Sequence, residues 1–261
     1  MVAFPPCKIN LGLNVLRKRP DGFHDLETCF FPVPWTDILE VIPSEIFSFA
    51  VTGNVIPGDD DNNLCVKAHR LLNAPPAKIH LHKIIPTGAG LGGGSSDAAW
   101  TLRLLNVVFD LGLSKEQLKT YAAQLGSDCA FFVDDVPMIG SGRGDILSPV
   151  NVDLKGKYLV IIKPGVHIST AEAYSGIVPK ESRLEIENIP IEQWRSKLKN
   201  DFEESVFKKF PQIALLKNSL YKAGALYASM SGSGSAVYGI FSEKIDHDKI
   251  SPGSTSYSGW L

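Results

Sequence analysis

The chain has 261 residues and a formal net charge of −2, so it lacks the broad positive field by which proteins bind nucleic acid, and we expect no nucleic-acid partner. Hydrophobic residues make up 44% of it and charged residues 21%, a composition that excludes global disorder. The length accommodates two compact domains with a cleft for a small molecule.

Cysteine spacing and hydropathy indicate the cellular compartment and the kinds of site to expect. The four cysteines are scattered without a C-x-x-C pair, which argues against a zinc site or a disulfide framework. No apolar run approaches the roughly 18 residues of a membrane span, and the N-terminus has no basic segment followed by an apolar one. We therefore expect a cytoplasmic protein with reduced cysteines and no membrane partner.

The first elements are strands. Apolar and polar residues alternate from Cys7 to Val15, which is the period of a half-buried strand, so Lys8 and Asn10 point to the same side. Asp21-Gly22 marks a turn, and residues 26–33 predict the returning strand.

Helices and strands then alternate up to residue 125. The spacing predicts a helix over 62–72, a strand over 78–84 and a helix that begins at Ser95 and continues to Leu105. Ser114 with Gln117 forms a capping box for a helix that ends at Leu125, before Gly126.

The last third predicts a strand over 158–162, a helix over 213–223, a strand over 236–241 and a loose Ser/Gly-rich tail after Ser251. We predict a boundary between two lobes near residues 151–157. Because the strands are amphipathic and not continuously apolar, an α+β protein with mainly antiparallel sheets is favoured over a doubly wound parallel fold.

The strongest local signal is a glycine-rich stretch, Pro86 to Ser96, with five glycines among residues 88–94. So few side chains let an anion approach the backbone amides, and the amphipathic helix that follows directs its N-terminus at the same place. A Rossmann unit is disfavoured because the preceding strand is amphipathic and Pro86 separates it from the glycines. A P-loop is excluded because G-x-x-x-x-G-K-[ST] is absent.

The glycine stretch resembles the phosphate loop of the GHMP kinases, and further motifs follow in that family's order. Lys8-Ile-Asn10-Leu resembles its first motif, Asp21-Gly-Phe-His24 a cytidine-binding segment and Gly126-Ser-Asp128 the catalytic-aspartate motif. The remaining motifs are Pro164-Gly-Val with Thr170 and Tyr174, Asn200-Asp201 with Glu203, and Ser231-Gly-Ser-Gly-Ser235.

The resemblance implies a two-lobed α+β GHMP kinase fold with a ribosomal-protein-S5-like N-terminal lobe, residues 1–152, and a ferredoxin-like C-terminal lobe, residues 153–261. The triple glycine is similar to one branch of the family. Its members use ATP to phosphorylate the 2-hydroxyl of 4-diphosphocytidyl-2-C-methyl-D-erythritol in the non-mevalonate route to isopentenyl diphosphate. The expected partner is therefore a small molecule that carries a cytidine diphosphate group.

The resemblance also assigns roles. Asp128 is the expected general base, and Lys8 offsets negative charge near the transferred phosphoryl group. The residues expected to bind ATP are Pro86, Thr87, Gly88, Ala89, Gly90, Leu91, Gly92, Gly93, Gly94, Ser95 and Ser96. Those expected to bind the acceptor are Asn10, Phe23, His24, Phe30, Thr170 and Tyr174. Mg²⁺ is expected on the ATP phosphates, with Ser96 as a ligand suggested by the wider superfamily.

Several alternatives stay open at this point. Phe30 equally fits a core position, Ser231–Ser235 a tight turn, and residues 140–144 a hairpin turn. The chain could act on homoserine or mevalonate, which have no base to stack on Phe23 and Tyr174. It could also be a nucleotide-binding regulator without catalysis, or an oxidoreductase that binds NAD.

Overall fold

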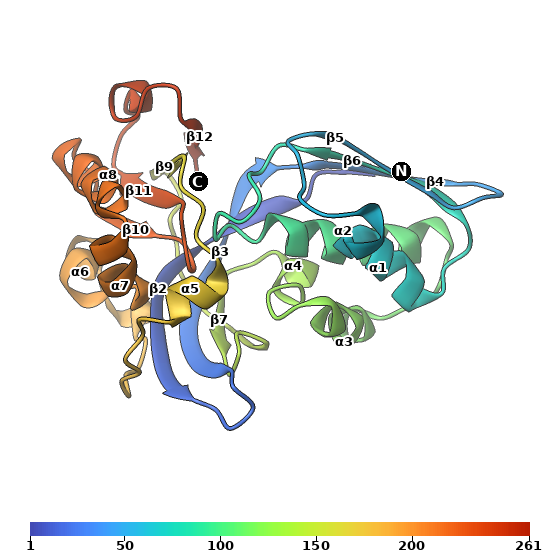
Figure 1. Cartoon of the computed structure of the whole chain (residues 1–261), viewed down its shortest axis with the longest axis horizontal. Coiled ribbons are helices and arrows are strands. Elements are labelled where there is room, and N and C mark those ends of the chain that lie inside the picture. The colour runs from blue at the N-terminus through green and yellow to red at the C-terminus, as the bar shows by residue number, and fades with distance from the viewer. The chain divides into compact units, whose positions relative to one another are not determined.

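The computed structural model describes residues 1–261, and the chain divides into two compact units (Figure 1). Unit 1 comprises Met1–Lys8, Trp35–Thr87 and Gly92–Val136, and unit 2 comprises Ile9–Pro34, Gly88–Leu91 and Pro137–Leu261. The glycine-rich loop is thus shared between them. The predicted boundary between residues 152 and 153 falls inside unit 2 and stays a prediction. Of the helices, none has both the length and the hydropathy needed to cross a bilayer.

Unit 1 is a four-stranded sheet with helices on one face (Figure 1). The strand order is β1-β4-β6-β5, and β5 pairs with β6 in parallel whereas the other pairs are antiparallel. The strands are β1 Val2–Ala3, β4 Ile38–Pro43, β5 Ser48–Gly53 and β6 Ala77–Lys83. The helices are α1 Leu64–Leu72, α2 Gly93–Val108, α3 Lys115–Leu125 and α4 Phe131–Asp134.

The core of unit 1 follows from the alternation in β4 and β6. Leu39, Ile79 and Leu81 point from the sheet onto Leu104 and Leu105 of α2, and all five are buried. This packing attaches the C-terminal half of α2 to the sheet, and the first turn of the same helix contains the end of the glycine-rich stretch.

Unit 2 contains two sheets, in strand orders β2-β3-β7-β8 and β10-β11-β9-β12. The strands are β2 Pro6–Lys18, which begins in unit 1, β3 His24–Thr36, β7 Met138–Ser141, β8 Ile146–Pro149, β9 Tyr158–Lys163, β10 Tyr227–Met230, β11 Val237–Phe241 and β12 Thr255–Trp260. Its helices are α5 Thr170–Tyr174, α6 Ile191–Lys197, α7 Phe202–Lys209 and α8 Pro211–Lys222.

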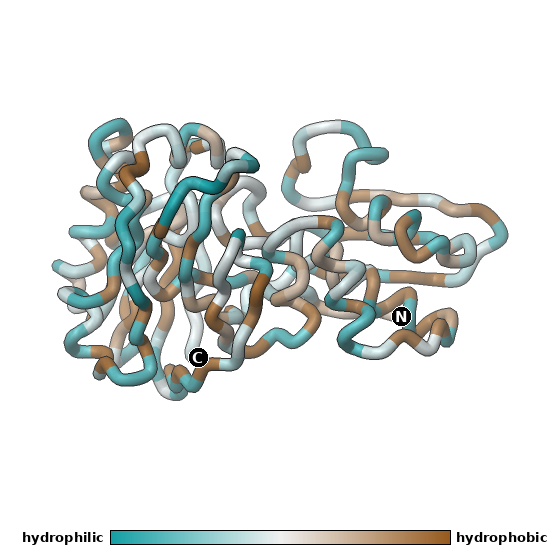
Figure 2. Tube along the Cα trace, turned by 90° about the horizontal axis from the view of Figure 1, so that it is seen from below, coloured by the Kyte–Doolittle hydropathy of each residue, from teal (hydrophilic) through white to brown (hydrophobic).

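The core of unit 2 lies between its second sheet and helices α7 and α8. Val160 and Ile162 of β9 pack with Phe202, Ile213 and Leu220 of the helices. In Figure 2 brown, hydrophobic segments run along strands and helices, and teal, hydrophilic segments predominate in connecting loops. Residues 140–144 cover the end of β7 and most of the turn, residues 142–145, that connects it to β8, so the hairpin interpretation is confirmed.

Most predicted elements are confirmed, and their ends moved by a few residues. The helix expected from Ser95 begins two residues earlier, at Gly93. The capping box at the start of α3 is present, with the Ser114 side chain accepting from the Gln117 amide and the Gln117 side chain accepting in return.

The prediction of a loose tail after Ser251 is wrong. Thr255–Trp260 forms β12, which pairs antiparallel with β9 along its whole length. The Tyr158 hydroxyl donates to Ser258 Oγ at 2.8 Å, and the Trp260 ring meets the Tyr158 ring edge-on at 5.1 Å. The Ser/Gly composition gave no sign of this strand because the ladder with β9, and not local propensity, holds it.

Deleting residues 255–261 should therefore destabilise unit 2, because one edge of β9 then loses its backbone partners. The matched variant Tyr158→Phe loses only the hydroxyl bond to Ser258 and should cost about 1 kcal/mol. Thermal unfolding checks both. Equal melting temperatures for the deletion and the wild type would show that β12 adds nothing.

Candidate active site

The part of the glycine loop in unit 1 forms the start of α2. Gly92 is the N-cap residue with φ +68, a left-handed conformation that suits glycine, and no side chain caps the helix. The amides of the first turn have no acceptor within the helix, and the positive end of the helix dipole lies here. This helix start is an anion-binding surface made of backbone.

Two predicted catalytic residues meet beside that helix start. Lys8 Nζ lies 3.5 Å from Asp128 Oδ2, although 120 residues separate them in the chain. A Cβ on Gly92 would lie 3.2 Å from Lys8 Cε and 2.9 Å from the Phe132 ring. Gly92 therefore makes room for the Lys8 side chain beside the start of α2.

The pair is asymmetric in exposure. The Lys8 side chain is 3% exposed and that of Asp128 is 33% exposed. Burial lowers the pKa of Lys8 below its ordinary value, and the Asp128 carboxylate opposes that shift. A carboxylate open to solvent beside a buried ammonium group can accept a proton from a hydroxyl that approaches from outside.

The part of the loop in unit 2, Gly88–Leu91, is hydrogen-bonded to the second glycine-rich segment, Ser231–Ser235. Ser231 Oγ donates to the Gly90 carbonyl at 2.8 Å, and the Ala236 amide donates to the Ala89 carbonyl at 3.1 Å. Asn200 Nδ2 in turn donates to the carbonyls of Met230 and Gly232, both at 2.8 Å. Ser231–Ser235 thus braces the phosphate loop and is more than a turn.

Gly90 is required at its position for two reasons. Its φ is +77, and a Cβ there would overlap the Ser231 carbonyl oxygen. Gly90→Ala should lower the melting temperature and raise the KM for ATP, because the brace must move. Gly94→Ala is the matched control for the melting temperature alone, since φ at Gly94 is not positive and a Cβ there meets nothing within 4 Å. Equal melting temperatures in the two variants would contradict the account of the brace.

The residues predicted to bind the acceptor lie in unit 2, but they do not form one set. His24 and Tyr174 stack directly, with ring centroids 4.7 Å apart and planes 24° apart. Phe23 is 55% exposed and lies instead against Arg143, whose Cζ is 5.2 Å from the centroid of the Phe23 ring. Burial and the positive charge of Lys18 lower the pKa of His24, so its neutral ring can both donate and accept hydrogen bonds at neutral pH.

Asn10, Thr170 and Phe30 occupy three different environments. Asn10 is buried, donates to Thr28 Oγ1 at 3.0 Å and accepts from Ser231 Oγ at 3.4 Å, which ties it to the brace. Thr170 is exposed in the first turn of α5. Phe30 is 2% exposed, with its ring edge against Gly140, as the core alternative expects.

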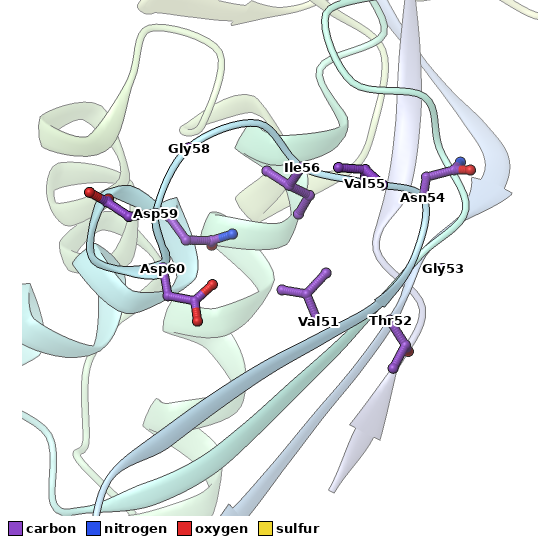
Figure 3. Close-up of a pocket in the computed structure, with 10 residues that line it drawn as sticks. Val51, Thr52, Gly53, Asn54, Val55, Ile56, Gly58, Asp59 and Asp60 are labelled. Carbon is purple, nitrogen blue, oxygen red and sulfur yellow. The ribbon is translucent and has the colours of Figure 1, made fainter.

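A cavity of about 240 Å³ in unit 1 was not predicted from the sequence (Figure 3). Ten residues between positions 51 and 63 line it, and Val51, Val55 and Ile56 are its apolar members. The Asn54 side chain donates to the Ile84 carbonyl at 2.7 Å, so this segment is anchored beside the chain that enters the glycine loop. The signal that the sequence offered was a short apolar segment between Gly53 and Gly58. In the structure Val55 of this segment is 85% exposed.

Comparisons with known proteins identify the family. The chain matches the family descriptions "GHMP kinases N terminal domain" over residues 63–143 and "GHMP kinases C terminal" over residues 185–251. It is 52% identical over 94% of its length to a 4-diphosphocytidyl-2-C-methyl-D-erythritol kinase of Cytophaga hutchinsonii, with 93% of that protein covered. It is 50% identical to the protein of that name from Bacteroides fragilis, over 94% of both chains.

A crystal structure of 4-(cytidine 5'-diphospho)-2C-methyl-D-erythritol kinase superposes with a TM-score of 0.85 at 31% identity, over 99% of this chain and 98% of that one. The match confirms the predicted α+β fold class. The N-terminal family match spans the glycine loop and Asp128. The chain belongs to the GHMP kinases.

Proposed function

We propose that this chain transfers the γ-phosphoryl group of ATP to the 2-hydroxyl of 4-diphosphocytidyl-2-C-methyl-D-erythritol, in the non-mevalonate route to isopentenyl diphosphate. The observation that carries the proposal is 52% identity over 94% of the chain to a kinase named for that substrate. The Lys8–Asp128 pair beside the start of α2 gives the chemistry a location.

Asp128 takes the proton of the 2-hydroxyl while the oxygen of that hydroxyl forms a bond to the γ-phosphorus. The bond from that phosphorus to the β–γ bridging oxygen breaks, and the products are ADP and the 2-phosphate. Phosphoryl transfer needs positioning and positive charge more than covalent participation. Lys8 and the first-turn amides of α2 supply that charge without rearrangement, since the lysine is already held in place by burial.

The nucleotide base fits the cavity of residues 51–63. Its apolar side chains offer a face for a purine, and exposed backbone between Gly53 and Gly58 offers hydrogen-bonding groups. The cavity lies on the segment anchored to Ile84, two residues before Pro86. A base bound there would leave the phosphates to the start of α2.

Mg²⁺ is assigned to the ATP phosphates, where it would neutralise charge on the β- and γ-oxygens. The protein atom that fits such a role is Ser96 Oγ, which is buried and has no hydrogen-bond partner. A hydroxyl oxygen is a ligand that magnesium accepts, in keeping with its preference for oxygen. No group of three or more His, Cys, Asp or Glu side chains is arranged to hold a metal by itself.

The test is direct phosphorylation by the purified chain. With Mg-ATP, it should convert 4-diphosphocytidyl-2-C-methyl-D-erythritol to the 2-phosphate with stoichiometric ADP, and it should leave homoserine and mevalonate unchanged. Phosphorylation of either smaller alcohol in preference would assign the chain to another kinase of the family. ATP binding without turnover on any of the three would favour the regulator.

Cytidine recognition makes a separate prediction about Tyr174, whose ring stacks on His24 and meets Phe202 edge-on. Tyr174→Ala should raise the KM for the acceptor by about 5- to 100-fold, the value of one stacked base. The KM for ATP should stay within about twofold. Tyr174→Phe keeps the ring and serves as the matched control. An unchanged acceptor KM in Tyr174→Ala would remove this residue from the cytidine site.

A further inference from the structure

Three buried charges form a chain beneath the glycine loop in unit 1. Lys83 Nζ donates to Asp37 Oδ2 and, at 2.7 Å, to Asp97 Oδ2. The three side chains are 1%, 0% and 2% exposed. Lys83 comes three residues before Pro86, yet with both carboxylates bound and no exposure it cannot reach a phosphate as a P-loop lysine does.

Both ends of the loop are tied to these charges. On the entering side, Asp37 Oδ1 accepts from the amides of Ile84 and Ile85, at 2.5 and 2.8 Å. On the leaving side, Asp97 belongs to α2 and directly follows Ser96. Asp37 itself is fixed to the N-terminal segment, because its amide donates to the Pro5 carbonyl at 3.0 Å.

The loop also contacts the ammonium group between its ends. A Cβ on Gly93 would lie 2.9 Å from Lys83 Nζ and 2.9 Å from Ile85 Cγ2. The lysine head therefore packs against the first residue of α2, and any side chain at position 93 would displace it. Position 93 needs glycine to let Lys83 support the helix start from below.

Burying two carboxylates and one ammonium group in a core costs desolvation free energy. Apolar side chains of similar volume often give equal or greater stability, whereas charged hydrogen bonds fix directions and distances. The bonds here run to the residues on either side of the glycines, where the loop has no side chains of its own to fix its shape. What they supply is the position of the loop.

We propose that Asp37, Lys83 and Asp97 are positioning residues that hold the glycine loop open for the nucleotide phosphates. The proposal rests on the proposed function only in taking ATP as the nucleotide. The three side chains are buried, so we expect them to act through the backbone of residues 84–96 and not by contact with phosphate or acceptor. Disturbing them should weaken binding of the phosphates and spare binding of the nucleoside.

The test compares dissociation constants for ATP and adenosine in Lys83→Met, measured below the melting temperature. The ATP constant should rise about tenfold or more, the equivalent of roughly one hydrogen bond to a charged group, and the adenosine constant should change less than about twofold. Leu104→Ala is the matched control, because Leu104 is a buried residue of the same helix that contacts the sheet. It should lower the melting temperature and leave both constants unchanged.

Should Lys83→Met fail to fold, the double variant Lys83→Met with Asp97→Asn removes the charges on both sides of one contact and keeps the volume. It should show the same selective loss of ATP affinity. Unchanged ATP affinity in a folded variant would overturn the proposal, as would equal loss for ATP and adenosine. The measurement uses no acceptor alcohol, so a wrong acceptor assignment would not alter it.

Discussion

Replacing Asp128 by Asn should lower kcat by about 10²- to 10⁴-fold, the usual contribution of a positioned general base. The carboxamide keeps the volume of the side chain but cannot take the proton of the 2-hydroxyl. Asp128 is one-third exposed, so the loss of its charge should not unfold unit 1. The dissociation constant for ATP should stay within about threefold, because we assign phosphate binding to backbone amides.

Asp134→Asn is the matched control for this experiment. Asp134 lies six residues further on, at the end of α4, and pairs with Lys115 and Lys119, with its own side chain 8% exposed. Its substitution removes the same charge from the same neighbourhood in sequence. If Asp128→Asn turns over as fast as this control, Asp128 is not the base.

Replacing Lys8 by Met should lower kcat by about 10²- to 10³-fold, the cost of removing one preorganised charge from the site. The straight apolar chain fills the space beside Gly92 and Phe132, so the local packing survives. Lys78→Met, at an exposed position of β6, is the matched control. A kcat within about threefold of wild type would show that Lys8 does not face the transferred group.

The pH dependence of kcat/KM gives an independent check on Lys8. Burial disfavours the charged form and lowers the pKa of Lys8 from the ordinary value of 10.5, so the ammonium group is lost at a lower pH than in a free lysine. The alkaline limb of the profile should therefore fall below pH 10.5. Lys8→Arg should move that limb upward, since a guanidinium stays protonated.

Patterns local in sequence were the most predictable part of the fold. The alternation in residues 7–15 predicted the strand β2, and the capping box predicted the start of α3. Both depend on neighbouring residues only. The expectation of a half-buried strand is wrong, because residues 7–15 are buried on both faces of the strand. The strand β12 depends on pairing with β9, about 100 residues away, and its Ser/Gly composition hid it.

The candidate site divides in the same way. The glycine loop could be predicted from the sequence because five glycines leave the backbone amides open to a ligand. The Lys8–Asp128 contact was expected from resemblance and could not have come from spacing. The Asp37–Lys83–Asp97 chain was missed, because three charges scattered over 60 residues look like surface residues until the fold brings them together.

The cavity of residues 51–63 was also missed. Its apolar residues follow a strand and precede a helix, where an exposed valine carries no distinctive periodicity. Asn54 connects it with the chain that enters the loop, through its amide to the Lys83 carbonyl and its side chain to the Ile84 carbonyl. Its role as the base site stays a proposal.

A crystal structure with a non-hydrolysable ATP analogue and the acceptor tests the central claim most directly. We expect the γ-phosphoryl group within hydrogen-bonding distance of Lys8 Nζ and the first-turn amides of α2, with the 2-hydroxyl of the acceptor reaching Asp128. Phosphates bound elsewhere, for example at the turn of residues 140–144, with Lys8 and Asp128 in contact with neither ligand, would contradict it.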